Sequence, residues 1–268
     1  MIGLLQSGVG CSLADLDTPQ RRDNGLVIIL PGIEGPSPWN YNLARGLADG
    51  GVRNSVQIYD WGTRIPGGML INLAHYERNR AMAASLRDYI LEYRRANPSR
   101  AVHLIGHSGG AGIAVMAAEM MPENERITTL ILLAAALSPD YDLRPALRNV
   151  SGGIFNYYSK LDAALLGVGT SVAGTIDRQH TMAAGAVGFR RPTTSDPSER
   201  DLYRKLHQVE WRPTMQRYGH IGDHMGWSDR NFVKHYLAPL VIEFNSWPSR
   251  PISDPDAPER ASTLIADG

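Results

Sequence analysis

Short, continuous apolar runs alternate along the chain with longer segments in which apolar residues recur at helical spacing. A strand that helices cover on both faces shows no alternation of polar and apolar residues, so each run predicts a buried strand. The strands are expected at residues 25–30, 55–61, 102–105, 128–137, 154–158 and 206–211.

The segments between these runs predict helices, which are delimited by glycines, prolines and capping residues. Helices are expected at residues 39–48, 69–97, 109–121, 144–149 and 228–244. Pro98 ends the second of them. Ser228 is a candidate N-cap for the last, within which Pro239 predicts a kink or an early end.

Strands that alternate with helices predict an α/β domain with a mainly parallel central sheet and helices on both faces. This domain is expected over residues 25–246, after an N-terminal leader segment at residues 1–24. Residues 247–268 are rich in proline and lack periodicity, which predicts a disordered tail. Residues 137–154 leave no room for a large cap domain. Residues 165–188, rich in Gly and Ala, have no assigned element and are interpreted as an insertion that could overhang the site.

The strand at residues 102–105 is joined to the helix that follows it by Gly106-His107-Ser108-Gly109-Gly110, a G-x-S-x-G sequence. A strand–turn–helix of this kind holds its serine in a strained backbone conformation with the hydroxyl exposed. The residues two before and two after the serine crowd each other, and both are glycines, which carry no Cβ. The helix N-terminus favours negative charge that develops at the serine. Ser108 is therefore the candidate nucleophile.

In this turn, and in the order of elements from about residue 25 to residue 241, the chain resembles the α/β-hydrolase superfamily, in particular its serine esterase and lipase-like members. The resemblance implies the α/β-hydrolase fold and a catalytic triad. In the family, an Asp or Glu and then a His follow the serine along the chain. The His activates the serine hydroxyl, and the acid orients the His.

The acid of such a triad is expected directly after a strand beyond the turn. Asp162 follows the strand expected at residues 154–158 and is the candidate. Asp140 and Asp142 follow the preceding strand and are alternatives, because some relatives carry the acid one strand earlier.

The base is expected on the loop before the last helix, where residues 218–227 contain two histidines. His224 lies close to the expected helix start, which resembles the family spacing, and is the candidate. His220 follows a glycine, as many family histidines do, and remains the alternative. Together with Asp223 the two could instead bind a metal, but no H-E-x-x-H sequence or second cluster accompanies them, so we expect no metal.

The oxyanion of a tetrahedral intermediate needs preorganised backbone amides. The resemblance implies Gly109 as one donor and Ile33, in the loop after the first expected strand, as the other. Pro31 stands where the family more often has histidine, so Glu34 is the alternative donor. Residues that could form an apolar wall around an acyl group are Met69, Leu70, Met225 and Trp227.

Two further histidines, His103 in a buried strand and His107 in the turn, are interpreted as structural. The sequence Gly167-Val168-Gly169 lacks the strand, spacing and helix of a dinucleotide-binding loop, so we expect no nicotinamide and no other cofactor.

The chain has 268 residues and a formal net charge of +0, with 27 basic and 27 acidic side chains. No long run of either sign occurs, which argues against nucleic acid or an anionic membrane as a partner. No apolar run is long enough to cross a bilayer. The single cysteine, Cys11, excludes an intramolecular disulfide and favours the cytoplasm. Residues 7–11 also resemble the end of a bacterial lipoprotein signal, with Cys11 as the lipidated residue, and this alternative is kept.

We therefore expect a serine hydrolase that cleaves a carboxylic ester of a small-molecule or lipid-like acyl substrate through an acyl-enzyme. The same triad also serves amidases, thioesterases and acyltransferases. An alternative of a different class is a catalytically silent α/β-hydrolase-fold scaffold that serves for binding.

Overall fold

The computed structural model describes residues 13–63, 75–162 and 175–246. Its strands form a sheet in the order β2-β1-β3-β4-β5-β6, in which all neighbours are parallel. The strand order reverses between β1 and β3, and ligands of such sheets bind at the carboxyl ends of the strands next to this point. The strands are β1 (Leu26–Leu30), β2 (Ser55–Ile58), β3 (Val102–His107), β4 (Ile127–Leu133), β5 (Val150–Tyr158) and β6 (Leu206–Glu210).

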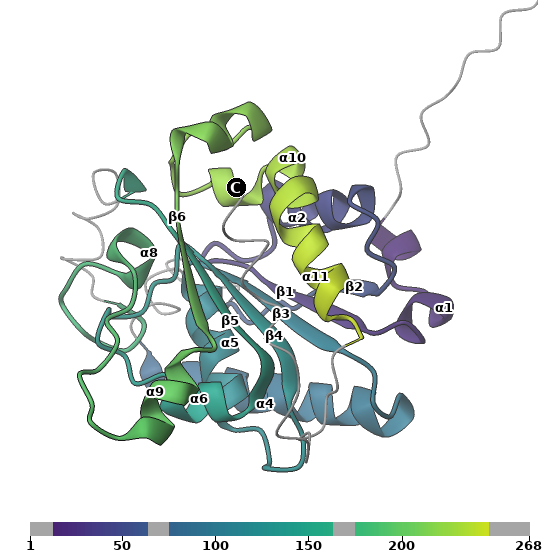
Figure 1. Cartoon of the computed structure of the whole chain (residues 1–268). Coiled ribbons are helices and arrows are strands. Elements are labelled where there is room, and N and C mark those ends of the chain that lie inside the picture. Colours follow the sequence, from purple (N-terminus) through teal and green to yellow (C-terminus); the bar gives the residue numbers. More distant parts are fainter. Residues whose placement is uncertain (1–12, 64–74, 163–174, 247–268) are drawn as a thin grey trace, which may run out of the picture.

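Helices cover both faces of this sheet, with α4, α5, α6 and α9 on one side and α2, α10 and α11 on the other (Figure 1). The α-helices are α1 (Pro19–Arg22), α2 (Pro38–Asp49), α4 (Tyr76–Ala96), α5 (Gly109–Glu119), α6 (Arg144–Arg148), α8 (Ala184–Val187), α9 (Pro197–Tyr203), α10 (Arg230–Phe232) and α11 (Ala238–Phe244). The 3-10 helices are η1 (Leu13–Leu16), η2 (Pro213–Tyr218) and η3 (Gly226–Ser228), and η4 (Val233–Leu237) is a π-helix.

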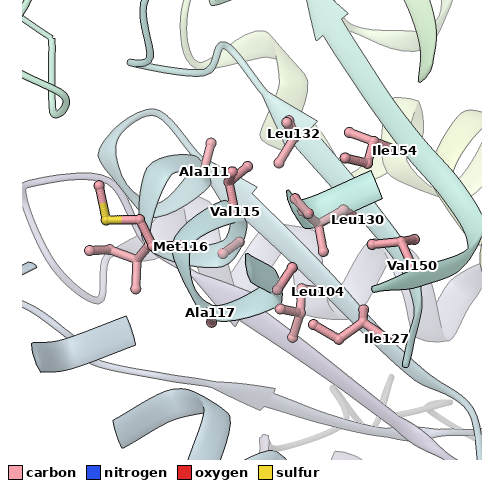
Figure 2. Close-up of a cluster of buried hydrophobic side chains, with 14 of the residues drawn as sticks. Leu104, Ala111, Val115, Met116, Ala117, Ile127, Leu130, Leu132, Val150 and Ile154 are labelled. Carbon is pink, nitrogen blue, oxygen red and sulfur yellow. The ribbon is translucent and has the colours of Figure 1, made fainter. Parts of the chain in front are cut away.

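Successive side chains of each strand enter two different hydrophobic cores, because the faces of a strand alternate. Leu26, Ile28 and Leu30 of β1 pack with α4 and α5, whereas Val27 and Ile29 pack with α2 and the C-terminal helices. Figure 2 shows part of the first core, where apolar side chains of α5 lie beside those of β3, β4 and β5. The expected α/β fold, with a mainly parallel sheet and helices on both faces, is confirmed.

Several boundaries differ from the expected ones, and the backbone explains the difference at β4. This strand ends at Leu133 rather than at residue 137, since Ala134 has a φ of 48° and turns the chain out of the ladder. The residues after it then bond to the turn that follows β3: the Ala136 amide donates to the Ser108 carbonyl at 3.1 Å. The apolar run thus continues beyond the strand because it is buried between loops.

The C-terminal helix does not start at Ser228, so this N-cap prediction is wrong. Ser228 ends η3, and Asp229 is the N-cap, with a carboxylate that accepts from the amides of Asn231 and Phe232. The helix then widens into the π-helix η4 directly before Pro239. Proline lacks an amide hydrogen and its ring clashes with a regular helical turn, which the wider turn relieves.

Several short helices were not expected from the sequence. Residues 13–24 contain η1 and α1, where Thr18 caps α1 and Leu16 is fully buried. Helix α9 and the 3-10 helix η2 were also missed, because elements this short show no periodicity. Residues 1–12 of the leader expected at residues 1–24, which include Cys11, and the expected tail at residues 247–268 lie outside the described residues.

The turn between β3 and α5 brings the backbone of three elements into contact. A Cβ atom on Gly106 would lie 2.7 Å from the Gly110 carbonyl oxygen and 2.5 Å from the Ala111 Cα. A Cβ atom on Gly110 would overlap the carbonyl oxygens of Leu30 and Pro31 at the end of β1. The expected crowding of Gly106 and Gly110 is thus present, and β1 takes part in it.

We expect Gly110→Ala to lower the free energy of unfolding by more than about 3 kcal/mol, because backbone rather than a flexible side chain must move. Gly51→Ala is the control, since Gly51 also has a positive φ, of 92°, but its Cβ would meet nothing closer than 3.8 Å. It is expected to cost about 1–2 kcal/mol. Urea unfolding measures both, and equal losses would contradict the close approach at Gly110.

Candidate active site

Ser108 lies at the carboxyl end of β3 and precedes the first residue of α5. Its φ of 52° and ψ of −119° are strained for a residue with a side chain. The backbone is held by β4 and its extension: the Ser108 amide donates to the Leu133 carbonyl at 2.9 Å, and the Ser108 carbonyl accepts from Ala136. The side chain is half-buried, at the N-terminus of an 11-residue helix whose amides favour negative charge.

Asp162 and His224 form a hydrogen bond of 2.8 Å between Asp162 Oδ2 and His224 Nδ1. The side chain of Asp162 is 5% exposed and that of His224 is 20% exposed, so the imidazole is the member of the pair that solvent reaches. Ser159 supports the arrangement, since its Oγ donates to the Gly222 carbonyl at 2.7 Å and its carbonyl accepts from the Asp162 amide. Ser159 therefore ties the loop after β5 to the loop that carries His224, a role that no sequence pattern indicated.

His107 approaches the same loop from β3. Its Nε2 lies 3.0 Å from the His224 carbonyl oxygen, and the two rings are 4.7 Å apart. Burial lowers the pKa of His107 to about 3, so the ring is neutral at neutral pH. Because a carbonyl oxygen only accepts, Nε2 carries the proton and donates.

The expected hydrogen bond between Ser108 and His224 is not made among the described residues. Ser108 follows His107 in the chain, and the ring of His224 packs against the ring of His107. Ser108 and His224 therefore lie in the same part of the molecule. Catalytic hydrogen bonds are often long or poorly aligned without substrate and tighten when it binds.

The two expected oxyanion donors lie beside each other. A Cβ atom on Gly109 would be 2.9 Å from Ile33 Cγ2 and 3.3 Å from the Trp61 ring. The loop that carries Ile33 is a turn in which the Gly35 amide donates to the Gly32 carbonyl at 3.1 Å. Trp61 fixes the start of this loop by a hydrogen bond of 2.8 Å to the Pro31 carbonyl. Glu34, whose backbone amide is the alternative donor, is an exposed residue of the same loop.

His220, the alternative base, is fully buried, and no hydrogen bond or ion pair of the described residues joins it to Asp162. Its Nδ1 accepts from the Gly222 amide at 3.1 Å, and its ring packs edge-on against Trp227 at 3.9 Å. Burial lowers the pKa of His220 to about 3. The structure thus places His220 in a cluster of aromatic rings, with its Nδ1 bound to a backbone amide.

Trp227 is fully buried in the same cluster, so the hypothesis that it forms part of an acyl wall is wrong. Met225 is half-buried. Met69, Leu70 and the Gly167–Gly169 segment lie outside the described residues.

The alternative acids also have other partners. Asp142 accepts from Arg144 at 2.8 Å, which holds the pKa of that carboxyl below its usual range, and Asp140 pairs with Arg190. Both line a cavity of about 520 Å³, together with Tyr76, Ser138, Asp177 and Arg178. Since Asp177 in turn accepts from Ser138, the cavity is lined by carboxylates that already have hydrogen-bond donors.

Within the described part of the chain, no group of three His, Cys, Asp or Glu side chains is arranged to hold a metal ion. The proposed ligands His220 and Asp223 are 3.9 Å apart, while His224 bonds to Asp162. No helix in the described ranges has the length and apolar character needed to cross a membrane.

We expect acid to destabilise the fold through His103, His107 and His220, whose pKa values burial lowers from 6.5 to about 3. The unfolded chain takes up protons near pH 6.5 and the folded chain does not, so the unfolding free energy falls as pH drops below 6.5. Each imidazole contributes up to about 1.4 kcal/mol per pH unit.

Urea unfolding at pH 7 and pH 5 checks this expectation, with His220→Asn as the comparison because its amide oxygen can replace Nδ1 as acceptor without titrating. The variant should lose less stability than the wild type between the two pH values. Burial raises the pKa of Glu119, which acts in the opposite direction in both proteins and cancels from the difference. Equal losses would contradict a neutral, buried His220.

The chain is similar to several known proteins. One similar solved structure is a dienelactone hydrolase-like promiscuous phosphotriesterase, P91, from metagenomic libraries, with 16% identity over 82% of this chain and 86% of that chain and a TM-score of 0.48. A cutinase-like protein from Cryptococcus sp. has 15% identity over 82% of this chain and 94% of that chain and a TM-score of 0.41. MenH from S. aureus has 13% identity over 82% of this chain and 94% of that chain and a TM-score of 0.40. No curated protein sequence matches the chain. The model of the alpha/beta hydrolase fold family matches residues 25–174. The chain therefore belongs to the alpha/beta hydrolase fold family, a fold that supports hydrolase activity.

Proposed function

We propose that the chain is a serine hydrolase that cleaves a carboxylic ester through an acyl-enzyme. The observation that carries the proposal is the 2.8 Å hydrogen bond between Asp162 and His224, on a loop bonded to the residue that precedes Ser108. A buried carboxylate that orients a partly exposed imidazole is the arrangement that activates a serine hydroxyl.

In the proposed reaction, Ser108 Oγ attacks the acyl carbonyl carbon while its proton passes to His224 Nε2. The carbonyl oxygen becomes an oxyanion, to which the backbone amides of Ile33 and Gly109 donate. When the tetrahedral intermediate collapses, the bond to the alcohol breaks and His224 returns the proton to the alcohol oxygen. Water then attacks the acyl-enzyme by the same steps, and the acid and free Ser108 are released.

Asp162 has two roles in this proposal. It accepts from Nδ1–H, which leaves Nε2 unprotonated and free to act as the base. It also stabilises the imidazolium that forms during the reaction, and this stabilisation is strong because the carboxylate is 5% exposed.

Two exposed apolar side chains favour an apolar acyl group. Leu161 is 50% exposed and precedes Asp162, and Ile221 is 64% exposed on the loop that carries His224. Their segments meet, since a Cβ atom on Gly222 would lie 2.7 Å from Leu161 Cδ1. This apolar surface lies next to the acid and the base and supports a lipid-like acyl chain as part of the substrate. An acyl chain that packs there releases water both from itself and from the protein surface.

Covalent labelling and a panel of p-nitrophenyl esters of increasing acyl chain length test the proposal. We expect a fluorophosphonate to label the wild type once, and not Ser108→Ala. Ser108→Ala and His224→Ala should lower kcat at least about 1000-fold. Asp162→Asn should lower it about 100- to 10,000-fold, because the imidazole loses its orienting acceptor.

Matched controls are Asp142→Asn and His220→Asn, which should keep kcat within about threefold. A folded wild type that is neither labelled nor active would support the silent scaffold instead. Loss of turnover in Asp142→Asn but not Asp162→Asn would move the acid to the preceding strand. A thioester and an amide of the best acyl group, compared by kcat/KM, separate an esterase from a thioesterase or an amidase.

A further inference from the structure

His107 is a buried side chain that the proposed reaction does not use. It is the last residue of β3 and directly precedes Ser108, so the two share one peptide bond. Its Nε2 donates to the His224 carbonyl at 3.0 Å across 117 residues of sequence. The ring also lies against the His224 ring, with 4.7 Å between the centroids.

Other hydrogen bonds also hold the loop around His224, but their side chains follow β5 and β6 rather than β3. Trp211 Nε1 donates to the His220 carbonyl at 3.0 Å, and Ser159 Oγ donates to the Gly222 carbonyl at 2.7 Å. These bonds fix the loop relative to β5 and β6. The bond from His107 fixes it relative to β3, the strand that ends in Ser108.

The chemistry of an imidazole at position 107 suits this contact. Because burial keeps the ring neutral, it can donate to the carbonyl without placing a positive charge beside His224. A lysine or arginine donor at the same place would oppose the imidazolium that the proposed reaction forms on His224.

We infer that His107 is a positioning residue that sets the distance between Ser108 and the base by binding the His224 backbone. The inference rests on the proposed function, in which His224 is the base. A misplacement of about 1 Å in a catalytic group can lower the rate about 100-fold, so a single backbone contact is enough to matter.

The test compares three variants with p-nitrophenyl butyrate. His107→Met removes the donor and keeps the volume, and His107→Gln restores a neutral N–H at the position of Nε2. The matched control is His103→Met, since His103 is also fully buried in β3 and loses one hydrogen bond, the 2.8 Å contact with Thr129.

We expect His107→Met to lower kcat about 10- to 100-fold with KM within about threefold of the wild type. His107→Gln should restore kcat to within about threefold. His103→Met should lose comparable stability in urea but keep kcat. Hydrogen exchange should speed up at residues 220–228 in His107→Met and not in His103→Met. Should His107→Met fail to fold, His107→Asn, whose amide is too short to reach the carbonyl, replaces it.

An unchanged kcat in His107→Met would overturn the inference, whether or not the loop exchanges faster. So would a loss in His107→Gln as large as that in His107→Met, or an equal loss in His103→Met. If the wild type shows no turnover that depends on Ser108, the proposed function fails. Separately, unchanged hydrogen exchange at residues 220–228 in His107→Met would refute the positioning role of the contact between His107 and the His224 carbonyl.

Discussion

The close approach of the β3–α5 turn to the end of β1 is the constraint on which the rest of the site depends. Gly106 and Gly110 leave no space for a Cβ atom, and the carbonyls of Leu30 and Pro31 close against the second of them. With the backbone this tight, Ser108 takes a positive φ and α5 begins at the next residue. The sheet thereby presents a hydroxyl and a helix N-terminus at the same point.

The other groups of the site come from loops that cross-link one another at the carboxyl ends of the strands. Asp162 follows β5, His224 follows β6, and a hydrogen bond of 2.8 Å joins them. Ser159 and His107 each bond to a backbone carbonyl of the His224 loop. A net hydrogen bond contributes only about 1 kcal/mol to stability, but a buried carbonyl left without a donor costs about 1–3 kcal/mol. The loops are therefore held by several contacts that are costly to break.

The features that sequence could predict are those with a local cause. The strand, the glycine-rich turn and Asp162 after β5 each follow from a short pattern of residues. Asp229 as N-cap was missed because Ser228 also caps helices, and only the 3-10 turn η3 decides between them. Trp227 was misjudged because its burial depends on His220 and Phe232, which pack around it in three dimensions.

The choice between the two loop histidines could also not be made from spacing alone. His220 and His224 lie four residues apart, yet one is enclosed by aromatic rings and the other faces solvent and a carboxylate. Burial lowers the pKa of the first and keeps it neutral, whereas the second forms a hydrogen bond to the Asp162 carboxylate. Burial, which is a property of the whole fold, separates a structural imidazole from a candidate base.

A crystal structure of the protein after reaction with a phosphonate ester tests most directly whether His224 and the amides of Ile33 and Gly109 surround the Ser108 oxygen. The account predicts phosphorus bonded to Ser108 Oγ, with the phosphonyl oxygen about 2.7–3.1 Å from the backbone nitrogens of Ile33 and Gly109. It also predicts His224 Nε2 within hydrogen-bond distance of the adduct while Nδ1 stays on Asp162. An adduct on another residue, or an oxygen that points away from both amides, would contradict it.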